Sequence, residues 1–320
     1  MVNIKSPATG EIPLKLAKKI TGQAKGLWRS GDFQQRASSV TRDLLKFWDP
    51  NGVFSNERSV NFNEGQWQSI LNIIYVHEIL KLSSVRDIYH QVEPELLTQM
   101  SLSELRQDRY EHPMYCVKMA TGTGKTWVLD ALLIWQYLNS KYEESASGLY
   151  SKNFLLIAPG IIVYERLLDA LLGKRKQDGD RDFELSDFTK FGRLFIPPAY
   201  KEVVFGFIKS SVAQKEEIGR KVTGEGVIAI TNWHLLAEDE DYEDTGDLSA
   251  LDRPDIAVNE LLPITPGISQ GHSLEELDNQ YLRGLELEYL ARLPDLVVFN
   301  DEAHHLGEMK KSDELVEKSI

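Results

Sequence analysis

M-A-T-G-T-G-K-T, which occupies residues 119–126, is the stretch of this sequence that decides the fold. It follows the phosphate-loop pattern G-x-x-x-x-G-K-[ST] at its last three residues, and Met119 stands where the pattern has its first glycine. The glycines let backbone N–H groups turn inward around a phosphate, the lysine adds a cation, and the final hydroxyl reaches Mg²⁺. The predicted ATP-binding residues of this loop are Thr121, Gly122, Thr123, Gly124, Lys125 and Thr126.

The segments on either side of the loop support this interpretation. Residues 115–119 (YCVKM) are short and β-prone, and we expect a strand there. Residues 127–138 are apolar nearly all round, which predicts a buried helix. The alternative is a glycine-rich turn that only joins a strand to a helix. A buried strand before the loop and a buried helix after it disfavour that alternative.

Three further strands are predicted from continuous apolar runs at residues 153–158 (NFLLIA), 226–231 (GVIAIT) and 296–300 (LVVFN). Such runs are typical of strands buried on both faces, as in a parallel sheet covered by helices. Polar or loop-forming residues follow each run, and ligands bind at that edge of an open α/β sheet. The sequence therefore predicts an α/β fold with a mainly parallel sheet between helices.

An acidic motif, D-E-A-H at residues 301–304, directly follows the last of these runs. A carboxylate at a strand end can hold Mg²⁺ through water, and a second carboxylate can orient and deprotonate the attacking water. We assign Asp301 to the metal and Glu302 to the water, so that the predicted catalytic set is Asp301, Glu302 and Lys125. His304 is the expected coupler between nucleotide and nucleic acid. The alternative is the exposed start of a helix, where acidic residues are favourable.

Composition limits the possible classes of protein. The chain of 320 residues has one cysteine, Cys116, which rules out an intrachain disulfide framework and fits a reducing compartment. Residues 1–10 do not resemble a signal peptide, and no apolar run approaches the roughly 20 residues that span a bilayer. We therefore expect a soluble, cytoplasmic protein.

The net charge of −13 opposes general binding to nucleic acid. Part of this charge lies in the acidic run at 238–247, which is typical of a solvated loop, so the total charge is weak evidence against a nucleic-acid contact elsewhere.

The phosphate loop and the sequence F-N-D-E-A-H-H together resemble superfamily-two helicases of the DEAH type, in particular the restriction (Res) subunit of type III restriction-modification enzymes. The resemblance implies a RecA-like motor lobe that uses ATP and Mg²⁺ to move along single-stranded or duplex DNA. It also implies a second motor lobe and a methyltransferase or nuclease as partners. We expect residues 61–320 to form the first lobe, with polar insertions near 173–187 and 237–284. Residues 1–60 are the expected N-terminal extension.

Gln66 begins a predicted helix and resembles the Q motif of these helicases. A glutamine amide can pair with both the donor and the acceptor edge of adenine, so Gln66 is the expected contact to the base. The alternative is a glutamine on the helix surface, and Gln68 is the rival candidate.

Two strand ends resemble motifs that contact the nucleic-acid backbone in the family. Gly160 and Arg166 follow the run at 153–158, and Thr231 and Asn232 follow the next run. For the first pair the alternative is a turn that merely ends the strand. The neighbouring Trp233 is as consistent with a core position as with a stacking platform.

Two other functions are compatible with a phosphate loop. The chain can be a non-hydrolysing protein that binds ATP and a partner in a defence complex. A P-loop kinase fits less well, because kinases place a substrate-binding lid in the chain, whereas Glu302 is positioned for water. In the helicase family that this sequence resembles, a second lobe supplies the arginines that stabilise charge on the transferred phosphoryl group. We expect the chain to stop before that lobe and to hydrolyse ATP weakly alone.

Overall fold

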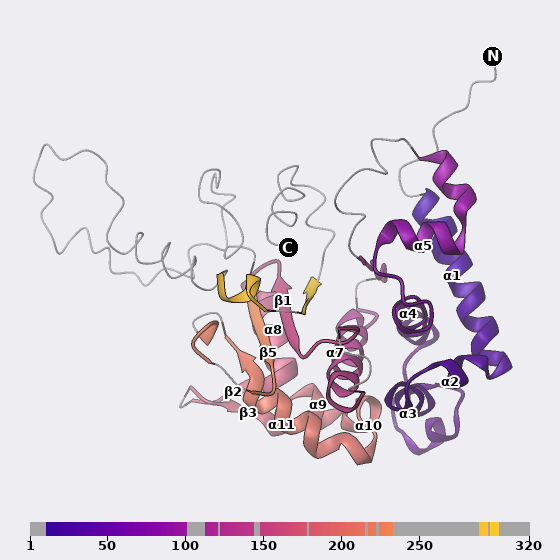
Figure 1. The fold of residues 1–320 in the computed structure, drawn as a ribbon. Coiled ribbons are helices and arrows are strands. Elements are labelled where there is room, and N and C mark those ends of the chain that lie inside the picture. Colours follow the sequence, from indigo (N-terminus) through magenta and orange to yellow (C-terminus); the bar gives the residue numbers. More distant parts are fainter. Residues whose placement is uncertain are drawn as a thin grey trace, which may run out of the picture.

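The structure, a computed structural model, describes residues 11–100, 113–120, 122–143, 148–177, 179–214, 217–221, 224–232, 288–293 and 295–300. Within these ranges, the long helix α7 (Lys125–Tyr142) lies between a group of N-terminal helices and a parallel sheet (Figure 1). None of the helices in these ranges combines the length and the apolar character that crossing a membrane requires.

The main sheet has four described strands in the order β4-β5-β1-β6, and each neighbouring pair is parallel. Their bounds are β1 Asn153–Ala158, β4 Val212–Ala213, β5 Val227–Asn232 and β6 Leu296–Asn300. A small antiparallel sheet pairs β2 Lys174–Arg175 with β3 Arg181–Asp182. Every residue of β1 and β5 is buried, as continuous apolar runs predict for a covered parallel sheet. The predicted α/β fold with a parallel sheet is confirmed.

The remaining described elements surround α7 and the sheet. Before α7 lie α1 Glu11–Ser30, α2 Asp32–Arg36, α3 Ser39–Trp48, η1 Val53–Glu57, α4 Glu64–Ile74, the π-helical turn η2 Tyr75–Ile79, α5 Val85–Val92 and η3 Pro94–Gln99. After β1 lie α8 Ile161–Leu172, η6 Phe183–Leu185, α9 Asp187–Lys190, α10 Gly192–Phe195, η7 Pro198–Tyr200 and α11 Lys201–Ser211. One hydrophobic core joins them, and residues on both sides of position 60, such as Trp48 and Phe154, belong to it.

The predicted strand at residues 115–119 is not formed. Residues 113–120 adopt neither helix nor strand. A β-prone run becomes a strand only where a neighbouring strand completes its hydrogen bonds. None of the described strands pairs with this run, and Tyr115 and Cys116 are exposed. The prediction for this strand is wrong, and the phosphate loop is entered from a segment without regular structure.

The first predicted insertion, residues 173–187, contains β2 and β3 and packs on α8. Arg181 ties it there, because its guanidinium donates to the carboxylates of Asp169 at 2.7 Å and Glu165 at 2.5 Å. Both carboxylates belong to α8, so the segment is an anchored hairpin. The second predicted insertion, residues 237–284, lies outside the described residues.

A buried carboxylate joins three of the helical elements before and at α7. Glu78, in η2, is 3% exposed. It accepts hydrogen bonds from the backbone N–H of Ser38 and the hydroxyl of Thr41, both at 2.6 Å. The indole N–H of Trp135, in α7, adds a third at 3.3 Å. A buried charge is tolerated only when it is well hydrogen-bonded, so Glu78 holds the start of α3 and η2 against α7.

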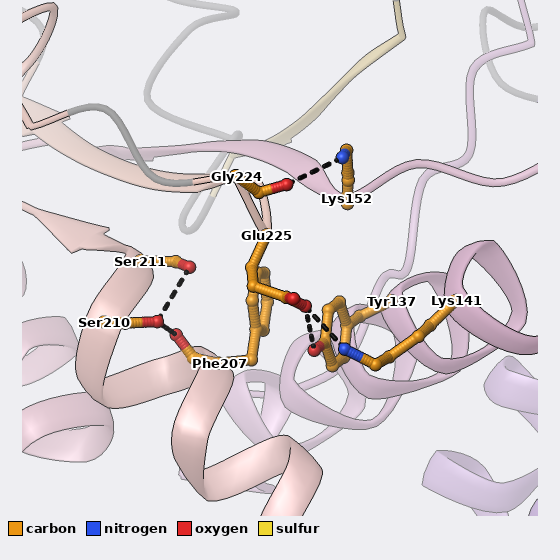
Figure 2. A network of polar contacts seen from close by, with 8 residues as sticks. All are labelled: Tyr137, Lys141, Lys152, Phe207, Ser210, Ser211, Gly224 and Glu225. Atoms are coloured by element: carbon orange, nitrogen blue, oxygen red, sulfur yellow. Dashed lines mark hydrogen bonds and ion pairs between the residues drawn. The ribbon is translucent and has the colours of Figure 1, made fainter.

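A second polar network joins the C-terminal end of α7 to the sheet (Figure 2). Glu225 accepts hydrogen bonds from the hydroxyl of Tyr137 at 3.2 Å and the ammonium group of Lys141 at 2.6 Å. The hydrogen bond from Lys141 lowers the pKa of Glu225. Lys152, just before β1, donates to the carbonyl oxygen of Gly224 at 3.0 Å. These contacts hold α7 beside the first residues of β1 and β5, at the sheet edge opposite the strand ends expected to bind ligands.

Replacing Thr41 by Val is expected to destabilise the protein by about 1.5–3 kcal/mol, because the variant lacks a hydroxyl that donates to the buried charge of Glu78. Urea unfolding followed by circular dichroism measures this loss. The matched control is Thr98→Val, since Thr98 is exposed and donates to the carbonyl oxygen of Glu95. The control is expected to change stability by less than about 0.5 kcal/mol. Equal losses in the two variants would contradict the role assigned to the Glu78 network.

Candidate nucleotide-binding site

The phosphate loop is a tight turn that runs directly into α7. Gly122 and Gly124 have φ values of 78° and 79°, in the left-handed region that glycine adopts without strain. Thr123 closes the turn, because its N–H and its hydroxyl donate to the carbonyl oxygen of Ala120 at 3.3 and 2.6 Å. The backbone conformation therefore accounts for both glycines. Thr121 lies outside the described residues.

The loop leads into the N-terminal end of an 18-residue helix. Gly124 is the N-cap of α7, and Lys125 and Thr126 are its first two residues. Within the described part of the chain, no side chain caps the helix. The start of such a helix attracts anions, because its first N–H groups and its dipole both favour negative charge. Lys125 and Thr126 are partly exposed, so both side chains lie at the surface of the loop where a phosphate is expected.

Aromatic side chains from a later segment support the first turn of α7. The ring of Trp127 packs against those of Phe191 and Phe195, with centroids 5.0 and 5.9 Å away. Asp187 accepts a hydrogen bond from Trp127, and burial raises the pKa of this carboxyl group. Sequence reasoning missed this support. The tryptophan directly after the K-T pair was the available signal, but nothing in its spacing identifies its partners.

Gln66 lies in the first turn of α4 and is 2% exposed, so the alternative of a surface glutamine is wrong. Its Oε1 accepts from the backbone N–H of Asn63 at 2.9 Å, which completes a capping box at the start of α4. Its Nε2 donates to the carbonyl oxygens of Thr123 at 3.1 Å and Gly124 at 3.0 Å. The structure therefore joins Gln66 to the phosphate loop, and its contact with adenine stays a prediction.

Three of the predicted nucleic-acid residues lie at the carboxyl ends of neighbouring parallel strands. Ala158 of β1 pairs with Asn232 of β5, and Thr231 precedes Asn232 in the same strand. Gly160 follows the end of β1 and is the N-cap of α8. The register therefore brings the backbone of Gly160 and the end of β5 to one edge of the sheet.

The side chains at this edge differ in their accessibility. Asn232 is 5% exposed, and its Oδ1 is a buried atom that has no hydrogen-bond partner among the described residues. A buried polar atom of this kind normally finds a partner in water, protein or ligand. Thr231 is fully buried, and its hydroxyl donates to the carbonyl oxygen of Asn232 at 3.3 Å. Arg166 is exposed and lies further along α8.

The acidic motif with Asp301, Glu302 and His304 lies outside the described residues. The strand before it is described: β6 ends at Asn300, which pairs with Ile157 of β1. β6 therefore ends at the edge of the sheet where β1 and β5 also end. Among the described residues, no group of three or more side chains suited to a metal ion is gathered.

Residues 60–320 match the model of a protein family described as the type III restriction enzyme, res subunit (ResIII). The match covers well over half of the chain and includes the phosphate loop, β1, β5 and β6. No curated protein and no solved structure matches the chain.

Substituting Ala for Lys125 is expected to weaken ATP·Mg²⁺ binding roughly 10- to 150-fold, because a charge-assisted bond to phosphate contributes about 1.5–3 kcal/mol. Isothermal titration calorimetry provides the two affinities. Lys141→Ala is the matched control, because Lys141 lies at the other end of the same helix and pairs with Glu225. Equal affinity in wild type and Lys125→Ala would remove Lys125 from the site.

Proposed function

Since the chain belongs to the family of type III restriction enzyme res subunits, whose domain is a helicase-like, RecA-like ATP-binding lobe, we propose that it couples ATP hydrolysis to movement along DNA. The observation that carries this proposal is the phosphate loop. Its glycines at 122 and 124 have positive φ, and it opens onto the uncapped start of α7. A loop of this shape is suited to the phosphates of a nucleotide.

In this proposal, the catalytic groups divide the work of phosphoryl transfer. Lys125 and the backbone amides of the loop hold the β- and γ-phosphates, and Glu302 orients the attacking water. Thr126 and Asp301 offer oxygen ligands of the kind that Mg²⁺ prefers, and the ion would neutralise charge on the transferred group. His304 couples this chemistry to the bound nucleic acid.

The proposed DNA contact lies at the carboxyl edge of the sheet. Support comes from the register that brings Gly160 beside the end of β5, and from the unpartnered Oδ1 of Asn232. Backbone amides and polar side chains position a nucleic-acid strand through its phosphates. Arg166, exposed on α8, is the proposed cation at this contact.

The proposed partners are a second motor lobe and a methyltransferase or nuclease, as the family implies. The second lobe would supply the arginine that stabilises charge on the transferred phosphate and would exclude water from the site. No observation favours the alternative of a non-hydrolysing ATP-binding protein.

Residues 1–320, purified alone, are expected to hydrolyse ATP very slowly, because the proposed catalytic groups provide positioning, whereas the family's charge-stabilising arginine comes from the second lobe. Adding a second lobe as a separate polypeptide is expected to raise turnover about 10³- to 10⁵-fold, and Glu302→Gln is expected to abolish that gain. Steady-state phosphate release, with and without DNA, measures both effects. Fast, DNA-stimulated turnover by the chain alone, at a rate per chain independent of protein concentration, would refute this division of labour.

Binding of the chain to single-stranded DNA is expected to be weak and to fall with salt. Few phosphates are contacted, so the slope of log affinity against log salt is expected to be shallow, about −0.7 for each neutralised phosphate. Arg166→Ala is expected to reduce the slope by one such step, whereas Arg29→Ala, an exposed arginine at the end of α1, leaves it unchanged. Fluorescence anisotropy over a salt series is the measurement. Tight binding that does not change with salt would place the DNA on another surface.

A further inference from the structure

The side-chain amide of Gln66 hydrogen-bonds to two successive peptide groups of the phosphate loop. Nε2 of Gln66 lies 3.1 Å from the carbonyl oxygen of Thr123 and 3.0 Å from that of Gly124. The nitrogen carries two protons, so it can donate one to each oxygen. Asn63 adds a longer hydrogen bond, from its Nδ2 to the oxygen of Thr123 at 3.4 Å.

These carbonyl contacts determine where the adjoining N–H groups point. In a trans peptide group the C=O of one residue and the N–H of the next point in opposite directions, and the described chain has no cis peptide bond. Holding the oxygens of Thr123 and Gly124 toward Gln66 therefore directs the N–H groups of Gly124 and Lys125 away from it. These two N–H groups are among those that a phosphate loop offers to its anion.

The close approach also explains a requirement for glycine at position 124. A Cβ atom there would lie 2.4 Å from Nε2 of Gln66, which is closer than real Cβ contacts come. A larger residue at position 124 would therefore have a strained φ and would push the amide of Gln66 away from the loop.

The same contacts leave both amide protons of Gln66 engaged. Its oxygen accepts the N–H of Asn63, its nitrogen donates to the loop, and the side chain is buried. To donate to a base, Gln66 would have to release at least one of these loop carbonyl oxygens, and its side chain is only 2% exposed. Losing a hydrogen bond from a buried amide is unfavourable.

We propose that Gln66 is a positioning residue that holds the phosphate loop in its anion-binding shape, and that it does not read adenine. The proposal rests on the proposed function, because it takes the triphosphate of ATP as the ligand of the loop. A loop already held in this shape loses less conformational freedom when the phosphates bind, and its affinity for them is correspondingly higher.

The decisive variant is Gln66→Glu. Glutamate still accepts the N–H of Asn63 and is favoured at this position of a capping box, so the start of α4 is retained. It has no proton to donate to the loop, however, and it sets a carboxylate against two carbonyl oxygens. Gln66→Met, which removes both polar groups without adding charge, is the second variant. Ser69→Ala is the matched control, because Ser69 lies on the same helix and its hydroxyl donates locally to the carbonyl oxygen of Gly65 at 2.8 Å.

The experiment measures binding of ATP and of inorganic tripolyphosphate, each with Mg²⁺, by calorimetry, with thermal unfolding as the test of folding. Gln66→Glu is expected to weaken binding of both ligands by the same factor, roughly 10-fold, and Gln66→Met by a similar factor, while Ser69→Ala changes neither affinity. A loss confined to ATP would overturn the proposal and assign Gln66 to the base. Unchanged binding of both ligands would overturn it as well. If wild type bound neither ligand, the proposed function itself would fail.

Discussion

Glu78 buries its carboxylate among three segments of the chain, and the position of α7 depends on the hydrogen bonds that it accepts from Ser38, Thr41 and Trp135. Separating these segments would leave a buried charge without donors, which is strongly unfavourable. Glu78 belongs to the π-helical turn that continues α4, and Gln66 lies at the beginning of α4. At the start of this continuous helical unit, Gln66 hydrogen-bonds to the phosphate loop. At its end, Glu78 hydrogen-bonds to Trp135 of α7, the helix that follows the loop.

The parallel sheet supplies the second constraint on the site. Because β1, β5 and β6 run in the same direction, their carboxyl ends meet at one edge. The register places Asn232 opposite Ala158 and Asn300 opposite Ile157, so β1, β5 and β6 end at the same edge of the sheet. Ligands bind at this edge in open α/β sheets. Together with the family match over residues 60–320, this arrangement is the basis for proposing a DNA motor.

The parts of the fold that were predicted correctly are those whose cause is local in the sequence. Continuous apolar runs identified β1, β5 and β6 as strands. The expected burial on both faces is confirmed for β1 and β5, whereas β6 is only partly buried and its Val298 is 39% exposed. The positive φ angles at positions 122 and 124 are likewise expected from glycines in a phosphate loop. The run at 115–119 was β-prone, but strand formation also depends on a partner, which local propensity does not provide.

The contacts that the sequence did not reveal join residues far apart in the chain. Gln66 meets carbonyl oxygens 57 and 58 residues later, and a glutamine amide suits a peptide group as well as a base. Glu78 meets Thr41, 37 residues earlier, and Trp135, 57 residues later. Neither spacing has a periodicity that could be read from the sequence. Every residue, moreover, has a backbone carbonyl, so a contact to a carbonyl cannot be recognised from the types of the side chains. The roles of Asp301, Glu302 and His304 rest on the sequence and stay predictions.

Hydrogen–deuterium exchange with and without saturating ATP·Mg²⁺ tests the central claim most directly, because it reports where the nucleotide binds without altering any residue. Backbone amides within residues 122–127 are expected to exchange more slowly when ATP is bound, since phosphate oxygens accept hydrogen bonds from amides such as those of Gly124 and Lys125. The amides of Thr123 and Trp127 already donate within the loop. Residues 137–141, at the other end of α7, are expected to exchange at an unchanged rate. Unchanged exchange at 122–127, or protection confined to another surface, would contradict the assignment of this loop as the ATP site.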